Sequence, residues 1–419
     1  MLSMGIQSSV RMNYMKFFKD KTLFLYLLYK FLYGLYPINV IIALFFLAKG
    51  LSYADIAIVF GVFSVAGFLF EIPTGFFGDR FGRKASVIVG LLTMTVTSIV
   101  WTQLQTTAQF AFSAAIWMLG ISFISGSLEA YIYDYLKVNK KVDIYDEVIS
   151  FSGGVNYFAA GIGSIIGAYL FSINQNYPYY LLAAFFCISA VIVSLMKSET
   201  KASESIGEEE VSVFSGLKHV FYSKELLFIT LFISLLYGFQ HYYIHSVDKP
   251  YILSLELFDV KWLGVFVAIV YAIQSLVVSQ FARLKKHLSE FQLITVSWII
   301  FTLGLLGMSK LFGVLGLIFA MVFYVSEPFK EAIINSFGQK HIPSKIRATT
   351  LSSIKVYESF VAAVLAVAAG YVFDIFELRT ALLIAAGYAS IVFILVLLYK
   401  KVRNIELAGK KIVIKSEDL

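Results

Sequence analysis

Several ionisable side chains of this 419-residue sequence lie inside long runs of apolar residues. A charged side chain in hydrocarbon costs at least about 2.5–3.5 kcal/mol, so each of these residues is a candidate for function. A carboxyl group in such surroundings can take up a proton, because loss of water disfavours its charged form. The candidates for proton coupling or gating are Glu71, Glu129, Asp134, Glu327, Lys330, Glu331 and Glu358.

Helical spacing groups the charges in the second part of the chain. Glu327 lies three residues before Lys330 and four before Glu331, and Lys355 lies three residues before Glu358. Residues at these spacings share a helix face and can pair. These charges therefore form either a self-neutralised structural network or part of a gate, and Lys355 is also a candidate for a substrate cavity.

Two charged residues in the first part of the chain, Lys30 and Glu71, each allow a structural and a functional interpretation. Lys30 either pairs with a carboxylate such as Glu129 or attracts an anionic substrate. Glu71 either meets Arg83 or Arg347 at the membrane edge or takes up protons. The neutral candidates for a cavity wall, which can equally form hydrogen bonds between helices, are Tyr33, Tyr36, Asn39, Asn156 and Gln240.

A pair of histidines raises the question of a metal. His241 and His245 are four residues apart and Asp248 follows, a spacing that can place ligands on one face. The aromatic neighbours favour a partly hydrated helix end instead, so we expect no metal and no cofactor. The absence of H-E-x-x-H, G-x-S-x-G and phosphate-binding Gly-Lys patterns argues against an enzyme.

The composition is that of a membrane protein. Hydrophobic residues make up 59% of the chain and charged residues 15%, too few charges to cover a soluble protein of this length. The formal charge of +7 is scattered through short loops, so we expect no nucleic-acid partner. The single cysteine, Cys187, excludes an internal disulfide. The first apolar run is too long for a signal-peptide core, so we expect it to be retained as a span.

The elements that must position these side chains are membrane-spanning helices. A run of about 20 apolar residues matches the roughly 30 Å hydrocarbon core, and only helices satisfy their backbone within it here. We predict an all-α protein with twelve spans, at residues 22–48, 52–77, 85–104, 108–136, 147–172, 177–197, 225–246, 260–281, 290–309, 312–338, 347–373 and 379–400.

Loop charges predict the orientation. Lys and Arg recur at every loop on one side, whereas the other side holds only Lys49, Lys249, Lys261, Lys310 and Arg379. Basic loops stay in the cytoplasm. We therefore expect a multi-pass protein of the cytoplasmic membrane with both termini in the cytoplasm.

The chain divides into two related halves. We predict an N-terminal six-helix bundle at 1–197, a cytoplasmic linker with an amphipathic helix at 198–223, and a C-terminal six-helix bundle at 224–419. Residues 129–132, Glu-Ala-Tyr-Ile, resemble residues 331–334, Glu-Ala-Ile-Ile, and residues 167–171 match 369–373 at the same offset. Repeated bundles of this kind are typical of transporters, which expose a central site alternately.

The loop after the second predicted span carries the most specific motif. Residues 75–84 read Gly-Phe-Phe-Gly-Asp-Arg-Phe-Gly-Arg-Lys. This resembles the signature of the major facilitator superfamily, G-x-L-x-D-R-x-G-R-K, with Phe77 where Leu is usual. The resemblance implies a secondary transporter with a latch that closes the cytoplasmic side, formed by Gly75, Gly78, Asp79, Arg80, Gly82, Arg83, Lys84 and Arg347.

The physics of the motif agrees with a latch. Gly75 and Gly78 allow helices to approach closely, and Gly82 permits a tight turn. Asp79 can face the positive N-terminal end of another helix, which the resemblance implies to be span eleven. The equivalent loop of the second half, residues 280–287, lacks the Gly and Asp, so we expect this latch in one half only.

Flanking motifs bear on the direction of transport. Glu71-Ile72-Pro73 before the signature resembles a branch of bacterial transporters that includes clostridial tetracycline efflux proteins. Drug/proton antiporters usually carry an Arg in span four and a Gly-Pro in span five, but residues 117–126 lack the Arg. Residues 161–167 hold glycines without the proline, suited to close packing against span eight near Gly264 and Ala268.

Two functions from this family and one from another class follow. The first is proton-coupled export of an amphiphilic compound by a monomer whose partners are a small-molecule substrate, protons and the lipid bilayer. The alternative is uptake of a small nutrient or organic anion, motivated by Lys30 and Lys355. The third is a membrane sensor that keeps the fold without transporting.

A substitution in the motif tests the latch. We predict that Asp79→Asn shifts the population toward states open to the cytoplasm, because an uncharged side chain loses its attraction for a helix N-terminus. Distances across the cytoplasmic ends of spans two and eleven measure the shift. Unchanged distances would refute the latch.

Overall fold

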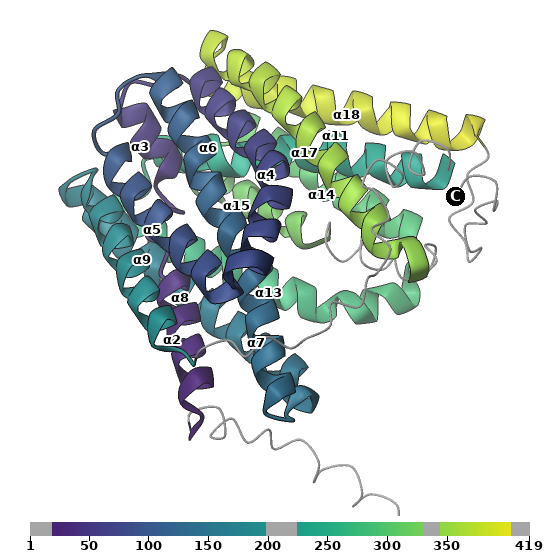
Figure 1. The fold of residues 1–419 in the computed structure, drawn as a ribbon. Helices are drawn as coiled ribbons and strands as arrows, with labels where there is room; N and C mark the ends of the chain where they lie inside the picture. Colours follow the sequence, from purple (N-terminus) through teal and green to yellow (C-terminus); the bar gives the residue numbers. More distant parts are fainter. Residues whose placement is uncertain (1–18, 198–223, 330–343, 404–419) are drawn as a thin grey trace, which may run out of the picture.

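The computed structural model describes residues 19–197, 224–329 and 344–403. This part of the chain is helical and forms two bundles (Figure 1). The N-terminal bundle contains α2 (Lys21–Gly34), α3 (Ile42–Ala48), α4 (Tyr53–Phe81), α5 (Arg83–Trp101), α6 (Thr107–Ile124), α7 (Ser127–Val138), α8 (Tyr145–Ile173) and α9 (Tyr177–Leu195). The C-terminal bundle contains α11 (Lys224–Ser246), α12 (Asp248–Ser254), α13 (Leu263–His287), α14 (Glu290–Lys310), α15 (Gly313–Val325), α17 (Ser344–Ile375) and α18 (Leu378–Val402).

Ten helices in the described ranges are long and apolar enough to cross a membrane, with α6 and α7 taken together as one of them. The two other predicted spans correspond to shorter helices. The run 22–48 contains α2 and α3, and the run 312–338 contains α15, with 330–338 outside the described residues. An all-helical membrane architecture is therefore confirmed, and the number twelve stays a prediction.

The predicted span at 22–48 is not one continuous helix. The helix stops at Gly34 and resumes at Ile42. Pro37 lies in between; it has no N–H to donate, and it disfavours helical backbone at Tyr36. Short-range bonds take over, with the N–H of Tyr36 donating to the carbonyl of Gly34 (2.7 Å) and that of Asn39 to the carbonyl of Tyr36 (3.2 Å).

Three further interruptions fall in predicted spans four, seven and ten or directly after them. Span four divides at Ser125 and Gly126, where Gly126 has a φ of 72°. Val247 separates α11 from α12, and Ser326 ends α15 in a turn before Glu327. The breaks at Gly126 and Ser326 are 200 residues apart, close to the repeat offset in the sequence. The predicted repeat thus has a counterpart in where the helices break.

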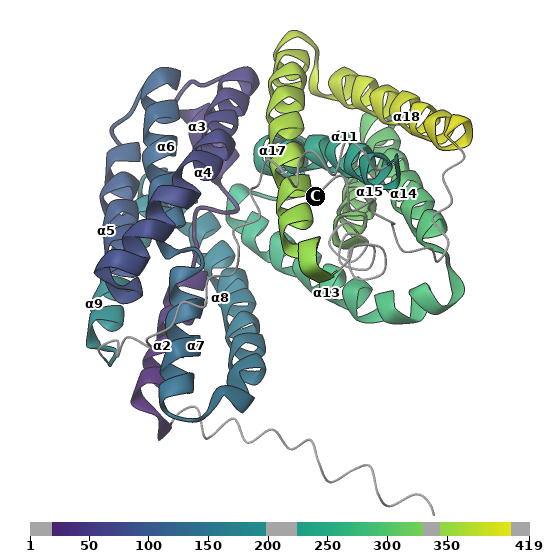
Figure 2. The ribbon, with the colours of Figure 1, turned by 45° about the vertical axis from the view of Figure 1, so that its right-hand side comes forward.

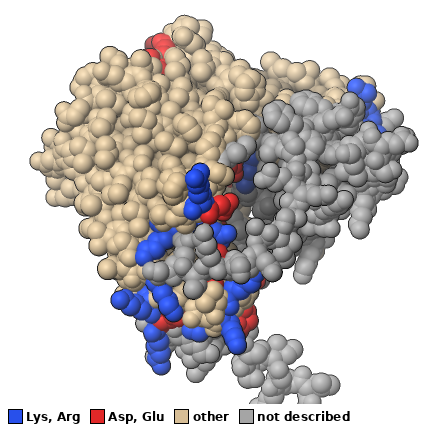
Figure 3. Space-filling view, in the orientation of Figure 1, with Lys and Arg blue, Asp and Glu red and all other residues tan. Residues whose placement is uncertain are grey.

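The two bundles meet at one end and separate toward the other. We call the end of the N-terminal bundle that carries Arg80, Arg83, Lys137, Lys140 and Lys141 the basic end. Figure 3 shows Lys and Arg gathered there, below a broad uncharged surface. Helices α4 and α17 lie side by side at the opposite end and diverge toward the basic end (Figures 1 and 2).

Glycines allow the closest backbone approaches. A Cβ at Gly264 of α13 would overlap the carbonyl oxygen of Ser164 in α8, as the expected packing against span eight requires. A Cβ at Gly167, however, would overlap the carbonyl group of Pro37. The glycines of α8 therefore also make room for the interrupted segment of the first predicted span.

A matched pair of substitutions on α8 tests this packing. We predict that Gly167→Ala lowers the thermal stability of the purified protein by at least about 2 kcal/mol, because its methyl group would overlap Pro37. Gly161→Ala is the control, since nothing lies within 4 Å of its Cβ position, and alanine favours helices. Equal thermal unfolding of the two variants would contradict the packing.

Candidate functional site

The ion pair between Lys30 and Glu129 joins α2 to α7. The Lys30 ammonium lies 3.7 Å from Oε1 of Glu129, and their side chains are 20% and 54% exposed. Of the two interpretations of Lys30, the structure thus shows the pairing with Glu129, and attraction of an anionic substrate stays a prediction. Glu129 lies in the first turn of α7, directly after the break at Gly126, where the positive end of the helix favours a carboxylate. The long distance and the exposure leave this pair able to exchange partners.

A hydrogen bond between the bundles lies near the break of the first predicted span. The side-chain amide of Asn39 donates to the hydroxyl of Tyr271 in α13 at 2.8 Å. Asn156 of α8 borders the same break, because a Cβ at Gly34 would lie 2.9 Å from its Oδ1. Asn39 lies within this break and Asn156 borders its start, and both stay cavity candidates, whereas the sequence analysis did not single out Tyr271. The one feature of the sequence that indicates Tyr271 is its hydroxyl-bearing ring within an apolar run.

Glu327 occupies a place in the C-terminal bundle that is equivalent to that of Glu129 in the N-terminal bundle. It follows the turn at Ser326, and its Oε2 accepts a hydrogen bond from Gln274 of α13 at 2.7 Å. Gln274 also donates to the carbonyl of Tyr324 at 3.1 Å. Each bundle therefore presents a carboxylate just after an interrupted helix, Glu129 after the break at Gly126 and Glu327 after the turn at Ser326.

The other neutral candidates belong to the packed interior. Gln240 is buried and donates to the hydroxyl of Ser326 at 2.8 Å. The rings of Tyr33 and Tyr29 stack 5.5 Å apart, and Tyr36 meets Trp117 edge-on at 6.4 Å. For Gln240 the structure favours an interhelical hydrogen bond, and Tyr33 and Tyr36 form an aromatic wall of the N-terminal bundle.

The basic residues of the motif act within the N-terminal bundle. Arg83 forms an ion pair of 2.7 Å with Asp134 of α7. The Lys84 ammonium donates to the carbonyls of Ser194 and Met196 at the end of α9, both at 2.7 Å. A cation at a helix C-terminus offsets the negative end of the helix dipole. Arg83 and Lys84 hold α5 to its neighbours, and Asp134 is an ion-pair partner here.

The remaining motif residues are differently placed. Gly82 is the single residue between α4 and α5, and its φ of 99° agrees with the expected tight turn. A Cβ at Gly78 would lie 3.2 Å from the hydroxyl of Ser127, whereas nothing lies within 4 Å of that position at Gly75. Asp79 and Arg80 are exposed. Arg347 lies in α17, but its side chain is outside the described residues, so the latch stays a prediction.

The ion pair that helical spacing predicts in span eleven, between Lys355 and Glu358, does not form between these two described residues. Glu358 is buried in α17 and Lys355 is exposed. Lys330 and Glu331 lie outside the described residues. Glu71 is exposed on α4.

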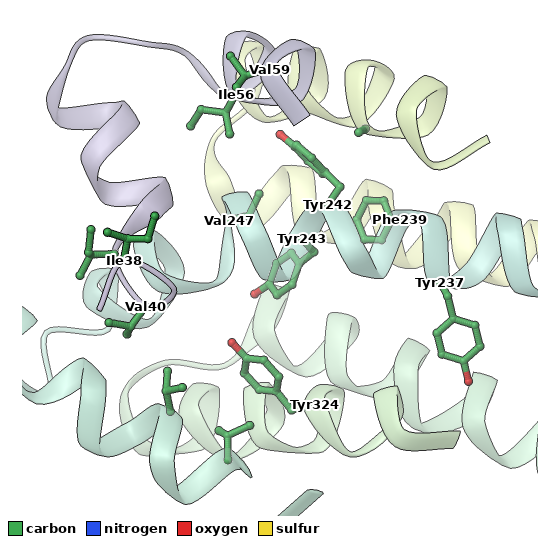
Figure 4. Packing of buried hydrophobic residues seen from close by; sticks show 14 of the residues in the cluster. Ile38, Val40, Ile56, Val59, Tyr237, Phe239, Tyr242, Tyr243, Val247 and Tyr324 are labelled. Carbon is green, nitrogen blue, oxygen red and sulfur yellow. The ribbon is translucent and has the colours of Figure 1, made fainter. Parts of the chain in front are cut away.

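A buried charge cluster in the C-terminal bundle was missed by the sequence analysis. Asp248 and Lys249, at the start of α12, form an ion pair of 2.5 Å with side chains only 1% and 9% exposed. Tyr324 of α15 donates to the same carboxylate, and Lys249 also donates to the carbonyl of Ile244 at 3.0 Å. Figure 4 shows the hydroxyl of Tyr324 directed toward Tyr243 across this interior.

The assignment of Lys249 to an outer loop is therefore wrong. The chain continues past Ser246 into α12 and keeps Lys249 among buried residues. A buried pair of this kind is tolerated because each charge has hydrogen-bond partners. The adjacent His245 packs against the ring of Phe60 in α4, with ring centroids 5.6 Å apart. No group of three or more potential metal ligands occurs in the described part of the chain.

A polar anchor ties α2 to α7 at the basic end. Asp20 caps α2 by accepting from the N–H of Thr22 (3.1 Å), and it accepts from the hydroxyl of Tyr135 (2.8 Å) and from Lys141 (3.1 Å). Burial alone raises the pKa of Asp20, but these hydrogen bonds outweigh it and hold the pKa below its usual value. Asp20 therefore stays charged at neutral pH.

Comparisons with known proteins identify what this arrangement is similar to. The sequence model described as Major Facilitator Superfamily matches residues 22–364. An uncharacterized MFS-type transporter of Bacillus subtilis, YxaM, is 22% identical over 376 residues, covering 86% of this chain and 91% of that protein. Multidrug resistance protein 1 of the same organism is 24% identical over 257 residues, covering 60% and 63%. The crystal structure of a nucleoside transporter, NupG, matches with a TM-score of 0.76 at 15% identity, covering 91% of this chain and 99% of that one.

The buried cluster yields a stability prediction. Asp248→Asn should lower the free energy of unfolding by about 3–5 kcal/mol, because it leaves the buried Lys249 ammonium without its counter-charge. Asp259→Asn is the control: Asp259 pairs with Lys261 at 3.4 Å on the surface, where such pairs contribute under about 1 kcal/mol. Thermal unfolding of the purified variants measures both.

The double variant Asp248→Asn/Lys249→Met separates charge from shape. It should recover much of the lost stability, since no buried charge is left unpaired. Equal stability of Asp248→Asn and Asp259→Asn would contradict the role of the cluster.

Proposed function

The chain belongs to the Major Facilitator Superfamily, and we propose that it exports an amphiphilic compound across the cytoplasmic membrane in exchange for protons. Transport follows from the two bundles alternately closing at the basic end and at the opposite end around a central site. The described arrangement, in contact at the opposite end and diverging at the basic end, corresponds to loading from the cytoplasm.

The observation that carries the proposal is the Lys30–Glu129 pair. Its length of 3.7 Å and the 54% exposure of Glu129 allow a proton or a cationic group to take the place of Lys30. Uptake of a proton by Glu129 releases Lys30, and loss of that proton restores the pair. The charge of the Glu129 carboxylate thus decides whether α2 and α7 are held together. Each of these two helices borders an interruption, α2 at its end and α7 at its start.

The surroundings support an amphiphilic substrate. Tyr33 and Tyr36 follow Lys30 in the same predicted span and are partly exposed, so their rings offer apolar surfaces to a substrate. Gln274 and Glu327 supply hydrogen bonding from the other bundle. The similarity to a multidrug resistance protein supports export.

The second candidate is uptake of a small nutrient or organic anion. Lys30 supports it, because an anionic group can compete with Glu129 for the ammonium. The structural likeness to a nucleoside transporter is compatible with it but shows the fold alone.

Proteoliposomes with an imposed pH gradient test the proposal. We predict that a gradient drives transport of a fluorescent amphiphilic cation, and that Glu129→Gln abolishes the effect of the gradient on the rate because a neutral amide cannot take up a proton. Glu147→Gln, at an exposed position in the first turn of α8, is the matched control and should keep that dependence.

Two outcomes would contradict the proposal. Transport that ignores the gradient in the unmodified protein rules out coupling to protons. Anion uptake that is lost in Lys30→Ala, without any transport of the amphiphilic cation, favours the second candidate.

A further inference from the structure

The start of α4 is completed by a side chain from the other bundle. The Oδ1 of Asp374, near the end of α17, accepts from the N–H of Tyr53 at 2.8 Å, and its Oδ2 accepts from the N–H of Ala54 at 2.9 Å. A carboxylate that receives two N–H groups at a helix N-terminus is favoured by both hydrogen bonding and the helix dipole. This contact crosses between the bundles at the opposite end.

Every other N–H in the first turn of α4 has a partner within its own helix. The hydroxyl of Ser52 accepts from Asp55, and the carbonyl of Ser52 accepts from Ile56. Only the N–H groups of Tyr53 and Ala54 lack a partner within α4, and Asp374 binds both. The cap of α4 is thus shared between the two bundles, so opening this end removes two of its hydrogen bonds.

The surrounding contacts bring the two helices close enough for the cap. A Cβ at Gly370, one turn before Asp374, would lie 2.6 Å from Cα of Ala54. Tyr242 of α11 donates to the carbonyl of Tyr53 at 3.2 Å, and Figure 4 shows its ring extending toward the helix that carries Ile56 and Val59. A side chain at residue 370 would keep α17 away from α4.

Both α4 and α17 carry an aspartate in their last turn, one at each end of the molecule. Helix α4 ends at Phe81 with Asp79 two residues before, and α17 ends at Ile375 with Asp374 one residue before. An aspartate in the last turn of a helix opposes the dipole of its own helix. The electrostatic energy of each aspartate becomes favourable only when its carboxylate lies against the N-terminus of the partner helix. Here Asp374 has that contact, and Asp79 is exposed.

We propose that Asp374 is a second latch, which holds the opposite end closed by capping α4. The two carboxylates then act in alternation. Asp374 caps α4 when the bundles diverge at the basic end, and Asp79 meets the start of α17 when they close there. Loss of either latch shifts the equilibrium toward the state that the other latch stabilises. This inference rests on the proposed alternating access.

Distances between spin labels measure that equilibrium without any substrate. Cysteines at the exposed positions Gln105 and Ser254 report on the opposite end, and cysteines at Val138 and Val402 report on the basic end, in a Cys187→Ser background. We expect Asp374→Asn to lengthen the first distance, shorten the second, and shift the ratio of the two states by about tenfold, the size of one or two charge-assisted hydrogen bonds. Asp79→Asn should shift both distances the other way.

A second variant removes the donor and leaves Asp374 in place. Tyr53→Pro deletes one capped N–H at the first helical position, which accepts proline, and Ser52 already has the extended backbone that a following proline needs. It should shift the distances as Asp374→Asn does, beyond the effect of Tyr53→Ala.

The controls decide between outcomes. Asp259→Asn removes a surface carboxylate at the same end and should leave both distances unchanged. The second latch is overturned if Asp374→Asn behaves like Asp259→Asn, or if it shifts the distances in the same direction as Asp79→Asn. Because no substrate or pH gradient is used, failure of proton-coupled export leaves this result standing, and the reverse also holds.

Discussion

The need to pair every backbone polar group inside a membrane governs this structure. An unpaired N–H or carbonyl in hydrocarbon costs several kcal/mol, so irregular backbone is tolerated only where protein or water satisfies it. The first predicted span breaks at residues 35–41 because the glycines of α8 pack against that backbone and short-range bonds replace the helical ones. At the break after α15, the hydroxyls of Tyr237 and Ser297 donate to the carbonyl of Ser326, both at 3.4 Å. The chemistry of the molecule gathers at these places, since a helix that restarts inside the membrane presents a positive end to nearby carboxylates.

The charges divide between two tasks. Asp20 with Lys141, Arg83 with Asp134, and Asp248 with Tyr324 each join elements within one bundle and so strengthen that bundle internally. The contacts between bundles are of another kind: hydrogen bonds such as Asn39 with Tyr271, and glycine approaches, which form and break without leaving a charge buried alone. Alternating access requires this division, because bundles that move as units need strong internal bonds and a weaker shared surface.

The sequence predicts much of the fold and only part of the site. Apolar runs and loop charges predict the positions of most helices, because membrane thickness dictates helix length. The pairing of Lys30 with Glu129 could be predicted because few charged residues lie inside such runs. The interruptions could not be predicted, because proline and glycine in a membrane helix break it only where neighbours satisfy the freed backbone. Lys249 was assigned to a loop because its place in α12 depends on tertiary packing. Asp374 was overlooked because a carboxylate at a predicted helix end is ordinary until its partner from the other bundle is seen.

The proposed loading from the side of the basic end requires the interrupted helices to face a water-accessible path between the bundles. Reaction of single cysteines with a membrane-impermeant thiol reagent, supplied to one side of sealed vesicles at a time, tests it most directly. With Cys187 replaced by Ser, Glu129→Cys and Glu327→Cys should react rapidly from the side of the basic end, and Val191→Cys on the exposed surface of α9 should react slowly from either side. Reaction of the first two only from the opposite side, or as slowly as that of Val191→Cys, would contradict the account.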